Sequence, residues 1–310
     1  MHKQRFSFGL IVFLFFFASK AFSQDFEPIR FEAKPVHDKD KSKLSAIQII
    51  EDSLVYYSDS MYYSSFPENK VEACYQFIRL IKGALNTPNS FTYPFEKLKE
   101  RIAILQAPDN SFRIYNWEII KSDVEKRYYA AMQLSNGTFI PLIDVSDQII
   151  RGLEDSVLMN SRWPGALYYN IVQKQIGNDQ IYFLFGWNGA SMNSEKKIVE
   201  PFGFNSQGKA VFGAPLFEIM DRGKRLAPNR FILEYQKGAK LSMNFDKETE
   251  QIIFDHCESQ IGDPNKKFTY VPDGTYDGLR WDGSRWIMSE NIVQISILEQ
   301  GNAPIERPIK

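Results

Sequence analysis

The sequence predicts an α+β fold, in which a short N-terminal helical segment is followed by a large antiparallel β meander. Before residue 107, apolar side chains recur every three or four positions, which is the period of an amphipathic helix. After residue 110, short alternating runs are separated by turn residues, and the connections are too short to hold crossover helices. A curved sheet, an open barrel and a sandwich all fit this pattern. A propeller stays an alternative without the regular repeat that would support it.

Residues 43–107 form the helical segment, which proline-containing turns divide into three helices. The first helix begins at Ser45, which forms a capping-box pattern with Gln48. The second follows Pro67, and the third begins near Pro94. The apolar stripes of the three helices, which must pack on another element, are Leu44, Ile47, Ile50, Leu54, Tyr57 and Met61; Val71, Cys74, Ile78, Ile81 and Leu85; and Phe95, Leu98, Ile102 and Leu105.

Residues 110–298 form the β-rich domain, and a tail of residues 299–310 follows it. Asn136-Gly137, between two alternating runs, is the strongest hairpin signal, because both residues tolerate positive φ. A polar stretch over residues 145–162 is predicted to be a helical interruption. The expected strands occupy residues 112–119, 128–134, 138–143, 166–173, 180–187, 197–204, 210–219, 230–235, 240–246 and 251–255.

Residues 1–23 have the three parts of a cleavable export signal. They are a positive start at Lys3 and Arg5, an apolar run over residues 6–18, and small residues at Ala21 and Ser23. The apolar run is too short for a membrane-spanning helix, which needs about 20 residues. We therefore expect an exported protein that is located in the periplasm or secreted.

Residues 24–42 are polar and charged, and are predicted to form an extended lead-in to the folded part. No cysteine follows the cleavage site, which argues against a lipoprotein anchor, and no later apolar stretch has the length of a transmembrane segment. Three of the 37 basic residues and none of the 38 acidic residues lie in the signal, so the mature chain has a formal charge of −4. This charge, without basic clusters, argues against nucleic acid or an anionic membrane as the main partner. We expect a soluble product.

Six short sequence segments of the β-rich domain are distinctive when taken together. They are Phe112-Arg-Ile-Tyr-Asn-Trp117, Trp163-Pro-Gly-Ala-Leu-Tyr-Tyr169, Phe183-Leu-Phe-Gly-Trp-Asn-Gly189, Ile232-Leu-Glu-Tyr235, Phe254-Asp-His256 and Tyr270-Val-Pro-Asp-Gly-Thr-Tyr-Asp-Gly278. Together they resemble the recurring phrases of a group of uncharacterised exported proteins of Bacteroidota, over residues 45–290. The resemblance implies an exported protein of a bacterial envelope, and it implies no activity.

Few residues of the mature chain suit nucleophilic or metal catalysis. Its two histidines, His37 and His256, are too few for an HExxH-type zinc site. A Ser-His-Asp site would need His256, but the neighbouring Asp255 points to the opposite face of a strand, so another acid would have to orient the ring. A G-x-S-x-G nucleophile turn is absent. We therefore favour a structural role for His256, as a polar residue that closes a strand or as a hydrogen-bonded buried histidine.

The two cysteines, Cys74 and Cys257, lack the CxxC spacing of thiol redox and zinc sites. Both are interpreted as small buried hydrophobic side chains. A disulfide between them is the alternative, since an exported protein reaches an oxidising compartment.

Carboxylates of the β-rich domain could supply an acid–base pair of the glycosidase type. The candidates are Asp144, Asp147, Glu200, Glu234 and Asp255. Because the chain has 38 acidic residues, several carboxylates are expected to lie in this domain by chance. We therefore treat a hydrolase, with a carboxylate pair in a groove of the β-rich domain, only as the alternative function.

Residues 272–283 place Asp273, Asp277 and Asp282 each before a glycine. Three carboxylates in a flexible loop are the oxygen ligands that Ca²⁺ prefers, so Ca²⁺ is the one cofactor that the sequence suggests. Asp-Gly pairs are also ordinary hairpin turns, and we favour consecutive turns that carry Tyr276 and Trp281 into the core.

Aromatic residues beside turns indicate a surface for a glycan or a peptide, because their rings form flat apolar platforms with polar groups at the edge. The candidate binding residues are Trp163, Trp187, Asn188, Tyr276 and Trp281. We favour the other reading, in which these large rings fill the β core. The predicted function is a non-catalytic binding or structural module of the cell envelope, with a glycan or an envelope protein as its partner.

Overall fold

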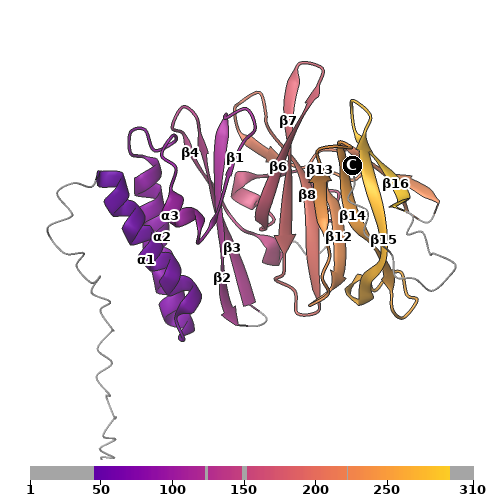
Figure 1. The fold of residues 1–310 in the computed structure, drawn as a ribbon, viewed down its shortest axis with the longest axis horizontal. Coiled ribbons are helices and arrows are strands. Elements are labelled where there is room, and N and C mark those ends of the chain that lie inside the picture. Colours follow the sequence, from indigo (N-terminus) through magenta and orange to yellow (C-terminus); the bar gives the residue numbers. More distant parts are fainter. Residues whose placement is uncertain (1–44, 123–124, 149–151, 222, 294–310) are drawn as a thin grey trace, which may run out of the picture. The chain divides into compact units, whose positions relative to one another are not determined.

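The computed structural model describes residues 45–122, 125–148, 152–221 and 223–293 (Figure 1). These residues are mostly β, and three α-helices precede the first strand. The α+β class, the N-terminal helices and the antiparallel sheets are confirmed. The predicted signal (1–23), lead-in (24–42) and tail (299–310) lie outside the described residues.

The first two helices have the predicted positions and buried faces. α1 (Ala46–Tyr63) begins after Ser45, whose backbone N–H donates to the Gln48 side chain at 2.7 Å, as in a capping box. α2 (Pro67–Leu85) starts with proline at its first position, where the missing N–H needs no partner. The buried residues of the two stripes, Leu54, Met61, Cys74, Ile81 and Leu85, share one hydrophobic core with the first sheet. Phe77, which the predicted stripe did not contain, is also buried there.

The third predicted helix is wrong beyond its first turn. α3 (Glu96–Lys99) has four residues, and the strand β1 (Ala103–Gln106) follows it. Ile104 packs with the helices whereas Leu105 packs on the other side of the sheet, which is the alternation of a strand. The strand forms because its backbone pairs with β2 (Phe112–Ser122), a partner that local periodicity does not reveal.

The first sheet is an antiparallel meander of β1 to β4 in chain order. β3 (Glu125–Leu134) and β4 (Phe139–Leu142) flank the predicted Asn136-Gly137 turn. Gly137 has a φ of 88°, and its N–H donates to the carbonyl oxygen of Leu134 at 2.8 Å. The predicted hairpin is therefore confirmed, but its loop has three residues, 135–137, and Asn136 does not adopt the positive φ that a two-residue turn needs.

The rest of the β-rich domain forms two further sheets. The second has the order β5–β9–β8–β7–β6, with β12 also paired to β8, and the third has the order β11–β10–β16–β15–β14–β13. Because β12 returns to the second sheet after β10 and β11, the chain is not one continuous meander. The pairs are antiparallel except β10 with β16. The bounds are β5 (Leu158–Met159), β6 (Leu167–Ile176), β7 (Asp179–Asn188), β8 (Ser194–Phe204), β9 (Ala210–Phe212), β10 (Phe217–Asp221), β11 (Lys224–Leu226), β12 (Phe231–Gln236), β13 (Met243–Asp246), β14 (Gln251–Ser259), β15 (Tyr270–Trp281) and β16 (Trp286–Val293).

The helical interruption predicted over residues 145–162 is wrong for most of its described part. Two short 3₁₀ helices, η2 (Ser146–Gln148) and η3 (Asn160–Arg162), lie there together with β5. The Asp144 side chain accepts the backbone N–H groups of Ser146 and Tyr128 at 2.8 and 3.0 Å. Such bonds from a side chain to the backbone compete with the hydrogen bonds of a helix.

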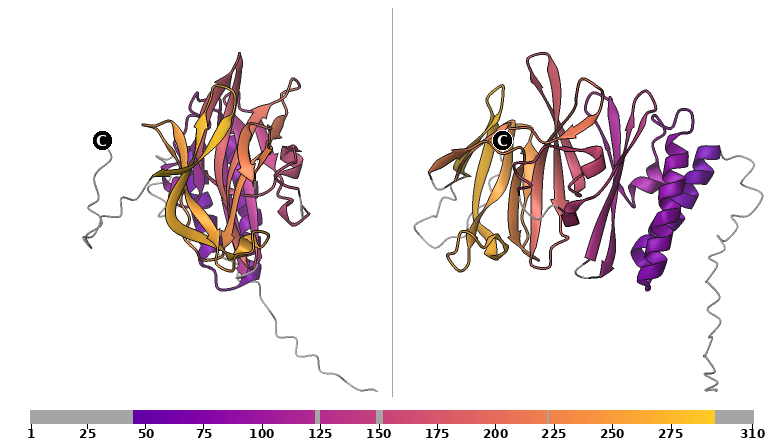
Figure 2. Two further views of the ribbon diagram at one scale, coloured as in Figure 1. Left: turned by 90° about the vertical axis from the view of Figure 1, so that its right-hand side faces the viewer. Right: turned by 180° about the vertical axis from the view of Figure 1, so that it is seen from behind.

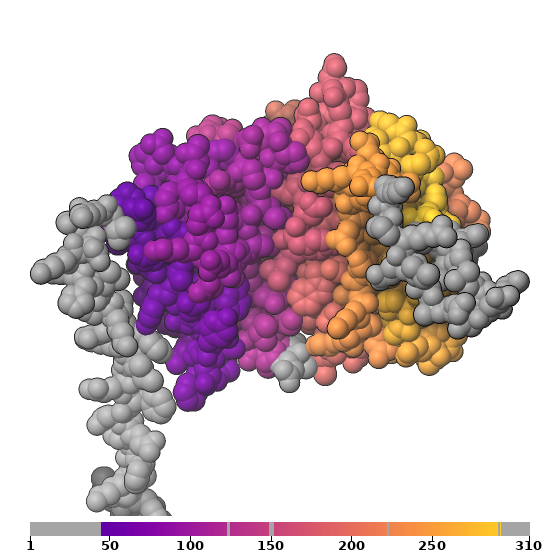
Figure 3. All heavy atoms as spheres, viewed as in Figure 1, coloured from indigo at the N-terminus to yellow at the C-terminus, as the bar shows by residue number. Residues whose placement is uncertain are grey.

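Four layers follow one another in chain order, namely the helices and then the first, second and third sheets (Figures 1 and 2). Figure 3 shows the same order at the surface, where the colours of successive segments lie side by side. In β2, Tyr115 and Trp117 pack on the helices, whereas Phe112 and Ile114 pack on the second sheet. Both faces of this sheet are buried, and the sheets stack without closing into a barrel.

A fully buried ion pair lies in the second sheet. Arg230 Nη2 is 2.8 Å from Glu200 Oε1, and the two side chains are 0% and 1% exposed. The Tyr168 hydroxyl donates to Glu200 Oε2 at 2.7 Å, and the Trp163 indole N–H donates to the Tyr168 hydroxyl oxygen at 2.8 Å. Arg230 Nη1 donates to the carbonyl oxygen of Ser156 at 2.9 Å. The network therefore joins the chain before β5 to the second sheet.

The two cysteines are free and lie in different layers. Cys74 is in the core between the helices and the first sheet, whereas Cys257 packs at the core between the second and third sheets. Packed layers lie about 10 Å apart, and a disulfide needs Cα atoms within about 7 Å. The prediction of a buried hydrophobic side chain is confirmed for Cys74, whereas Cys257 is half-buried, and the disulfide alternative is wrong.

We expect both thiols to react slowly while the protein is folded. Burial raises the pKa of Cys74 to about 11 and that of Cys257 to about 12, so little thiolate is present at pH 8. Ellman's reagent should titrate two thiols per chain in guanidinium, without prior reduction, and far more slowly in buffer. Fewer than two thiols in the unreduced, denatured protein would contradict the separation of the cysteines.

Candidate functional site

Two of the five predicted binding residues fill hydrophobic cores. Trp163 is 0% exposed and lies between the first and second sheets, so its assignment to a binding surface is wrong. Trp281 is half-buried, and its ring centroid is 5.6 Å from that of Phe183 and 5.3 Å from that of Trp286. Both rings fill the β core, which is the second interpretation of the aromatic residues given above.

Two other predicted residues, Trp187 and Tyr276, line one open groove between the second and third sheets. The groove has a volume of about 660 Å³. We call it the Trp187 groove, and its lining residues are Trp187, Lys197, Tyr235, Ala239, Lys240, Leu241, Ser242, Met243, Asn244, Asp255 and Tyr276. Trp187 lies near the end of β7 and Tyr276 lies in β15, so packing of the two sheets brings them together.

Hydrogen bonds and charges fix the polar groups of the Trp187 groove. Glu195 Oε2 accepts from the indole N–H of Trp187 at 3.3 Å and from the hydroxyl of Tyr235 at 3.2 Å. Lys197 Nζ lies 4.5 Å from the centroid of the Tyr169 ring, and burial lowers the pKa of Lys197. The groove thus combines aromatic rings with a cation and hydrogen-bonding groups.

Gly189 gives the Trp187 ring its position. A Cβ atom at residue 189 would lie 2.4 Å from the Trp187 ring, closer than carbon atoms approach without displacement. The Gly189 N–H donates to the hydroxyl oxygen of Tyr128 at 2.7 Å, which fixes the backbone beneath the ring. Lys126 Nζ also lies 4.5 Å from the centroid of the Trp187 ring, within the range of a cation–π contact.

Asn188 has a structural role in a neighbouring pocket. Its Nδ2 donates to the carbonyl oxygen of Gly165 at 2.7 Å, and its Oδ1 accepts the Ala190 N–H at 3.0 Å. The pocket has a volume of about 510 Å³. It is mostly polar, with the charged lining residues Lys121, Glu125, Lys126, Arg127, Asp147 and Lys196.

The five carboxylates of the hydrolase alternative have structural partners. Glu200 belongs to the buried ion pair, and Asp144 accepts two backbone N–H groups. Asp147 and Glu234 form ion pairs with an arginine and a lysine, at 3.0 and 3.9 Å. Asp255 accepts a backbone N–H at 2.5 Å. These contacts position backbone and neighbouring side chains, so they do not favour a catalytic pair.

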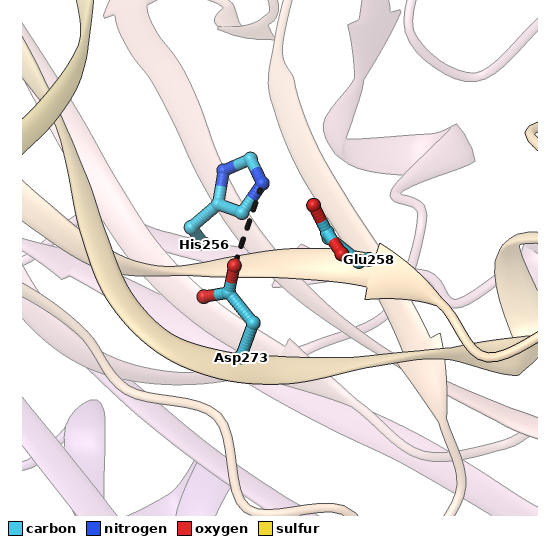
Figure 4. Close-up of side chains that lie close together, drawn as sticks. All are labelled: His256, Glu258 and Asp273. Carbon is cyan, nitrogen blue, oxygen red and sulfur yellow. Dashed lines mark ion pairs between the residues drawn. The ribbon is translucent and has the colours of Figure 1, made fainter.

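A cluster of His256 with carboxylates lies on β14 and β15 (Figure 4). Asp277 Oδ2 is 2.8 Å from His256 Nδ1, and Asp273 Oδ2 is 4.0 Å from His256 Nε2. Glu258 also points toward this group, and one ligand atom from each of His256, Glu258 and Asp273 lies within 4.8 Å of the other two. Asp277 is buried, whereas Glu258 and Asp273 are exposed.

The cluster favours a positive charge at its centre. Burial by itself lowers the pKa of His256, but the hydrogen bond with Asp277 and the charges of Asp277, Asp273 and Glu258 raise it above its usual value. For Asp273, burial raises the pKa, and hydrogen bonds from Thr275 together with the charge of His256 bring it below its usual value. An imidazolium or a bound cation would both be stabilised here.

The third carboxylate of the predicted Ca²⁺ site lies elsewhere. Asp282 Oδ1 accepts the backbone N–H groups of Ser284 and Arg285, at 2.8 and 2.9 Å, in the turn after β15. Asp273 lies near the other end of the same strand, nine residues and roughly 30 Å away along an extended chain. The predicted set of Asp273, Asp277 and Asp282 is therefore wrong as one site. The expected consecutive turns are also wrong, because most of the segment belongs to β15.

Sequence reasoning predicted only part of the His256 cluster. It excluded Asp255 as the acid that orients the imidazole ring, and in the structure Asp277 of the neighbouring strand has this role. Asp277 pairs with Phe254, two residues before His256 on the same face of β14, and a bulge of β15 places Asp273 opposite His256. The sequence reveals neither the register nor the bulge. In the described structure His256 Nε2 faces Asp273, so the cluster does not have the arrangement of a Ser-His-Asp triad.

The described helices contain no segment with both the length and the apolar composition needed to cross a membrane.

Comparisons with known proteins give no further information about the site. No protein-family model, curated protein or solved structure matches the chain.

Proposed function

We propose that the protein is a non-catalytic binding module that holds a glycan in the Trp187 groove. The observation that carries this proposal is the meeting of Trp187 and Tyr276, from two different sheets, in one open groove with Lys197 and Asp255. Sugar rings stack on aromatic faces, and their hydroxyl groups need donors and acceptors at the edge of the platform. The groove offers both kinds of group.

The location proposed for this activity is the bacterial cell envelope, in the periplasm or after secretion. The export signal predicted over residues 1–23 and the resemblance to exported proteins of Bacteroidota support it. Glycans and glycan-bearing proteins are abundant there. The structural partners of the five candidate carboxylates make a hydrolase the weaker alternative.

Truncation of the groove aromatics should weaken binding at least tenfold. The mature chain, residues 24–310, would be titrated with soluble oligosaccharides and peptidoglycan fragments, and binding followed by calorimetry. A central aromatic side chain in an interface contributes about 2 kcal/mol or more, so Trp187→Ala and Tyr276→Ala should each lower the affinity by at least this tenfold factor. Trp187→Phe should retain part of it, because a ring remains.

A matched control is Tyr63→Ala, which removes a 78% exposed ring from α1, far from the groove in sequence and in layer. It should bind as the wild type does, and thermal unfolding should establish that every variant is folded. Absence of binding to all glycans at high micromolar concentration would contradict the proposal. So would a folded Trp187→Ala variant with unchanged affinity.

A further inference from the structure

The His256 cluster has the geometry of a metal centre with an oriented histidine. Asp273 uses its two oxygens for different purposes: Oδ1 accepts the N–H and the hydroxyl of Thr275, at 2.9 and 2.8 Å, whereas Oδ2 faces His256 Nε2. The carboxylate is therefore held with one oxygen directed into the cluster. Glu258 brings a second, exposed carboxylate from β14 to the same place.

Asp277 supplies an independent observation, because it lies behind the histidine and does not belong to the three ligand groups. Its side chain is 3% exposed, and it engages His256 Nδ1 at 2.8 Å. Metal-binding histidines commonly donate the N–H of their second ring nitrogen to a carboxylate, which fixes the tautomer and directs the free lone pair at the metal. With Nδ1–H donated to Asp277, the lone pair of Nε2 points toward Asp273 and Glu258.

The backbone directs these side chains to one place. Asp255 pairs with Tyr276 and Cys257 with Pro272, so β15 has two extra residues opposite His256, and the bulge comprises Asp273, Gly274 and Thr275. A bulge re-aims a side chain relative to the regular alternation of a strand, here that of Asp273. Within the bulge Gly274 has a φ of 91°, a conformation that glycine adopts without steric cost. His256, Glu258 and Asp273 thus converge although they come from two strands (Figure 4).

We propose that His256 Nε2, Glu258 and Asp273 bind a divalent first-row transition-metal ion, with Zn²⁺ as the best match, and that Asp277 is a positioning residue for His256. Metal–ligand bonds of about 2.0–2.2 Å in a tetrahedral site place ligand atoms roughly 3.4 Å apart. The ligand atoms lie within 4.8 Å of one another, with 4.0 Å between His256 Nε2 and Asp273 Oδ2, so metal binding requires the exposed carboxylates to move inward. The fourth position is open to water or to a ligand.

The donor set selects the class of metal. An imidazole nitrogen with two carboxylate oxygens suits Zn²⁺ and its transition-metal neighbours, whereas Ca²⁺ and Mg²⁺ prefer oxygen ligands alone. The site thus differs from the Ca²⁺ site that the sequence suggested, which contained no histidine. It is also independent of the proposed glycan binding, because none of its three ligands lines the Trp187 groove.

Calorimetry with Zn²⁺ tests the site in the untagged mature chain after treatment with EDTA. We expect one ion per chain with micromolar affinity, and a rise in Tm of roughly 5 °C at a hundredfold excess over Kd, which EDTA reverses. Ca²⁺ at the same concentration should neither bind nor compete. His256→Ala should abolish binding, and Glu258→Gln and Asp273→Asn should each weaken it at least tenfold.

Two further variants separate a positioning role from a structural one. Asp277→Asn should weaken Zn²⁺ binding by about 10–100-fold in a protein that is folded, a change that a purely structural residue would not produce. Asp282→Asn is the matched control, because its carboxylate serves the turn beyond β15, and it should bind Zn²⁺ as the wild type does.

Two results would overturn the proposal. One is the absence of Zn²⁺ binding at about 100 µM to the folded wild-type protein, which would leave the cluster as a group of ion pairs around a protonated His256. The other is unchanged binding in His256→Ala. If that variant fails to fold, the exposed Glu258→Gln decides the question, and unchanged affinity in it would also reject the site.

Discussion

Replacement of Arg230 by alanine is expected to lower the free energy of unfolding by about 3–5 kcal/mol, because it leaves the buried carboxylate of Glu200 without its counter-ion. Both side chains are at most 1% exposed, so water cannot take the place of the guanidinium group. Glu200 keeps a hydrogen bond from Tyr168, which compensates only in part. Equilibrium unfolding in urea, analysed by linear extrapolation, measures the loss.

Two controls show whether the loss comes from an unpaired buried charge. The double variant Glu200→Leu with Arg230→Met removes both charges, so it should be less destabilised than the sum of its single variants. Lys121→Ala breaks an exposed pair with Glu125, in which the side chains are 32% and 60% exposed, and should change stability by less than about 1 kcal/mol. An Arg230→Ala variant within that same range would contradict the predicted role of the pair.

Truncation of Phe183 to alanine is expected to lower the free energy of unfolding by about 3–5 kcal/mol, because it opens a cavity between the second and third sheets. The ring is 0% exposed, and it packs edge-on against the rings of Phe217, Trp281 and Trp286 at centroid distances of 6.1, 5.6 and 5.6 Å. Denaturant unfolding would measure the cost. Phe268→Ala, which removes a 44% exposed ring, is the control with little expected effect.

The same experiment tests whether the layers unfold together. Phe112 occupies the core between the first and second sheets, as Phe183 does between the second and third. Because the second sheet contributes one face to each core, we expect Phe112→Ala and Phe183→Ala to shift one common unfolding transition. Two transitions, each sensitive to only one of the variants, would contradict this expectation.

Local patterns were sufficient for features that depend on neighbouring residues. The helical stripes placed α1 and α2, and Asn136-Gly137 placed a hairpin, because capping and turn geometry are set within a few residues. The third helix failed for the opposite reason. Ile102 and Leu105 fit a helical spacing, yet the chain near them pairs with β2 to complete a sheet.

Stacking of the sheets explains why the site was only partly predicted. Trp163 and Trp187 both lie beside turn residues, and only their places in the layers make one a core residue and the other part of a groove. In a strand that is buried on both faces, alternate side chains enter two different cores. The alternation of the sequence therefore does not show which side chains face solvent. His256 and Asp277 are 21 residues apart and meet through the pairing of β14 with β15, whose register the sequence does not reveal.

The order of the layers also bears on how the chain acquires its structure. A chain synthesised from its N-terminus completes the helices first and then the sheet that covers them. Most strands of the second sheet follow before those of the third, although β12 of the second sheet comes after β10 and β11. Each completed layer offers an apolar face on which the following segment can fold. The same face is open to association with other chains until that segment arrives. Premature termination after residue 204 would therefore leave Phe183 and Phe185 of the second sheet without their cover, and such a fragment should aggregate.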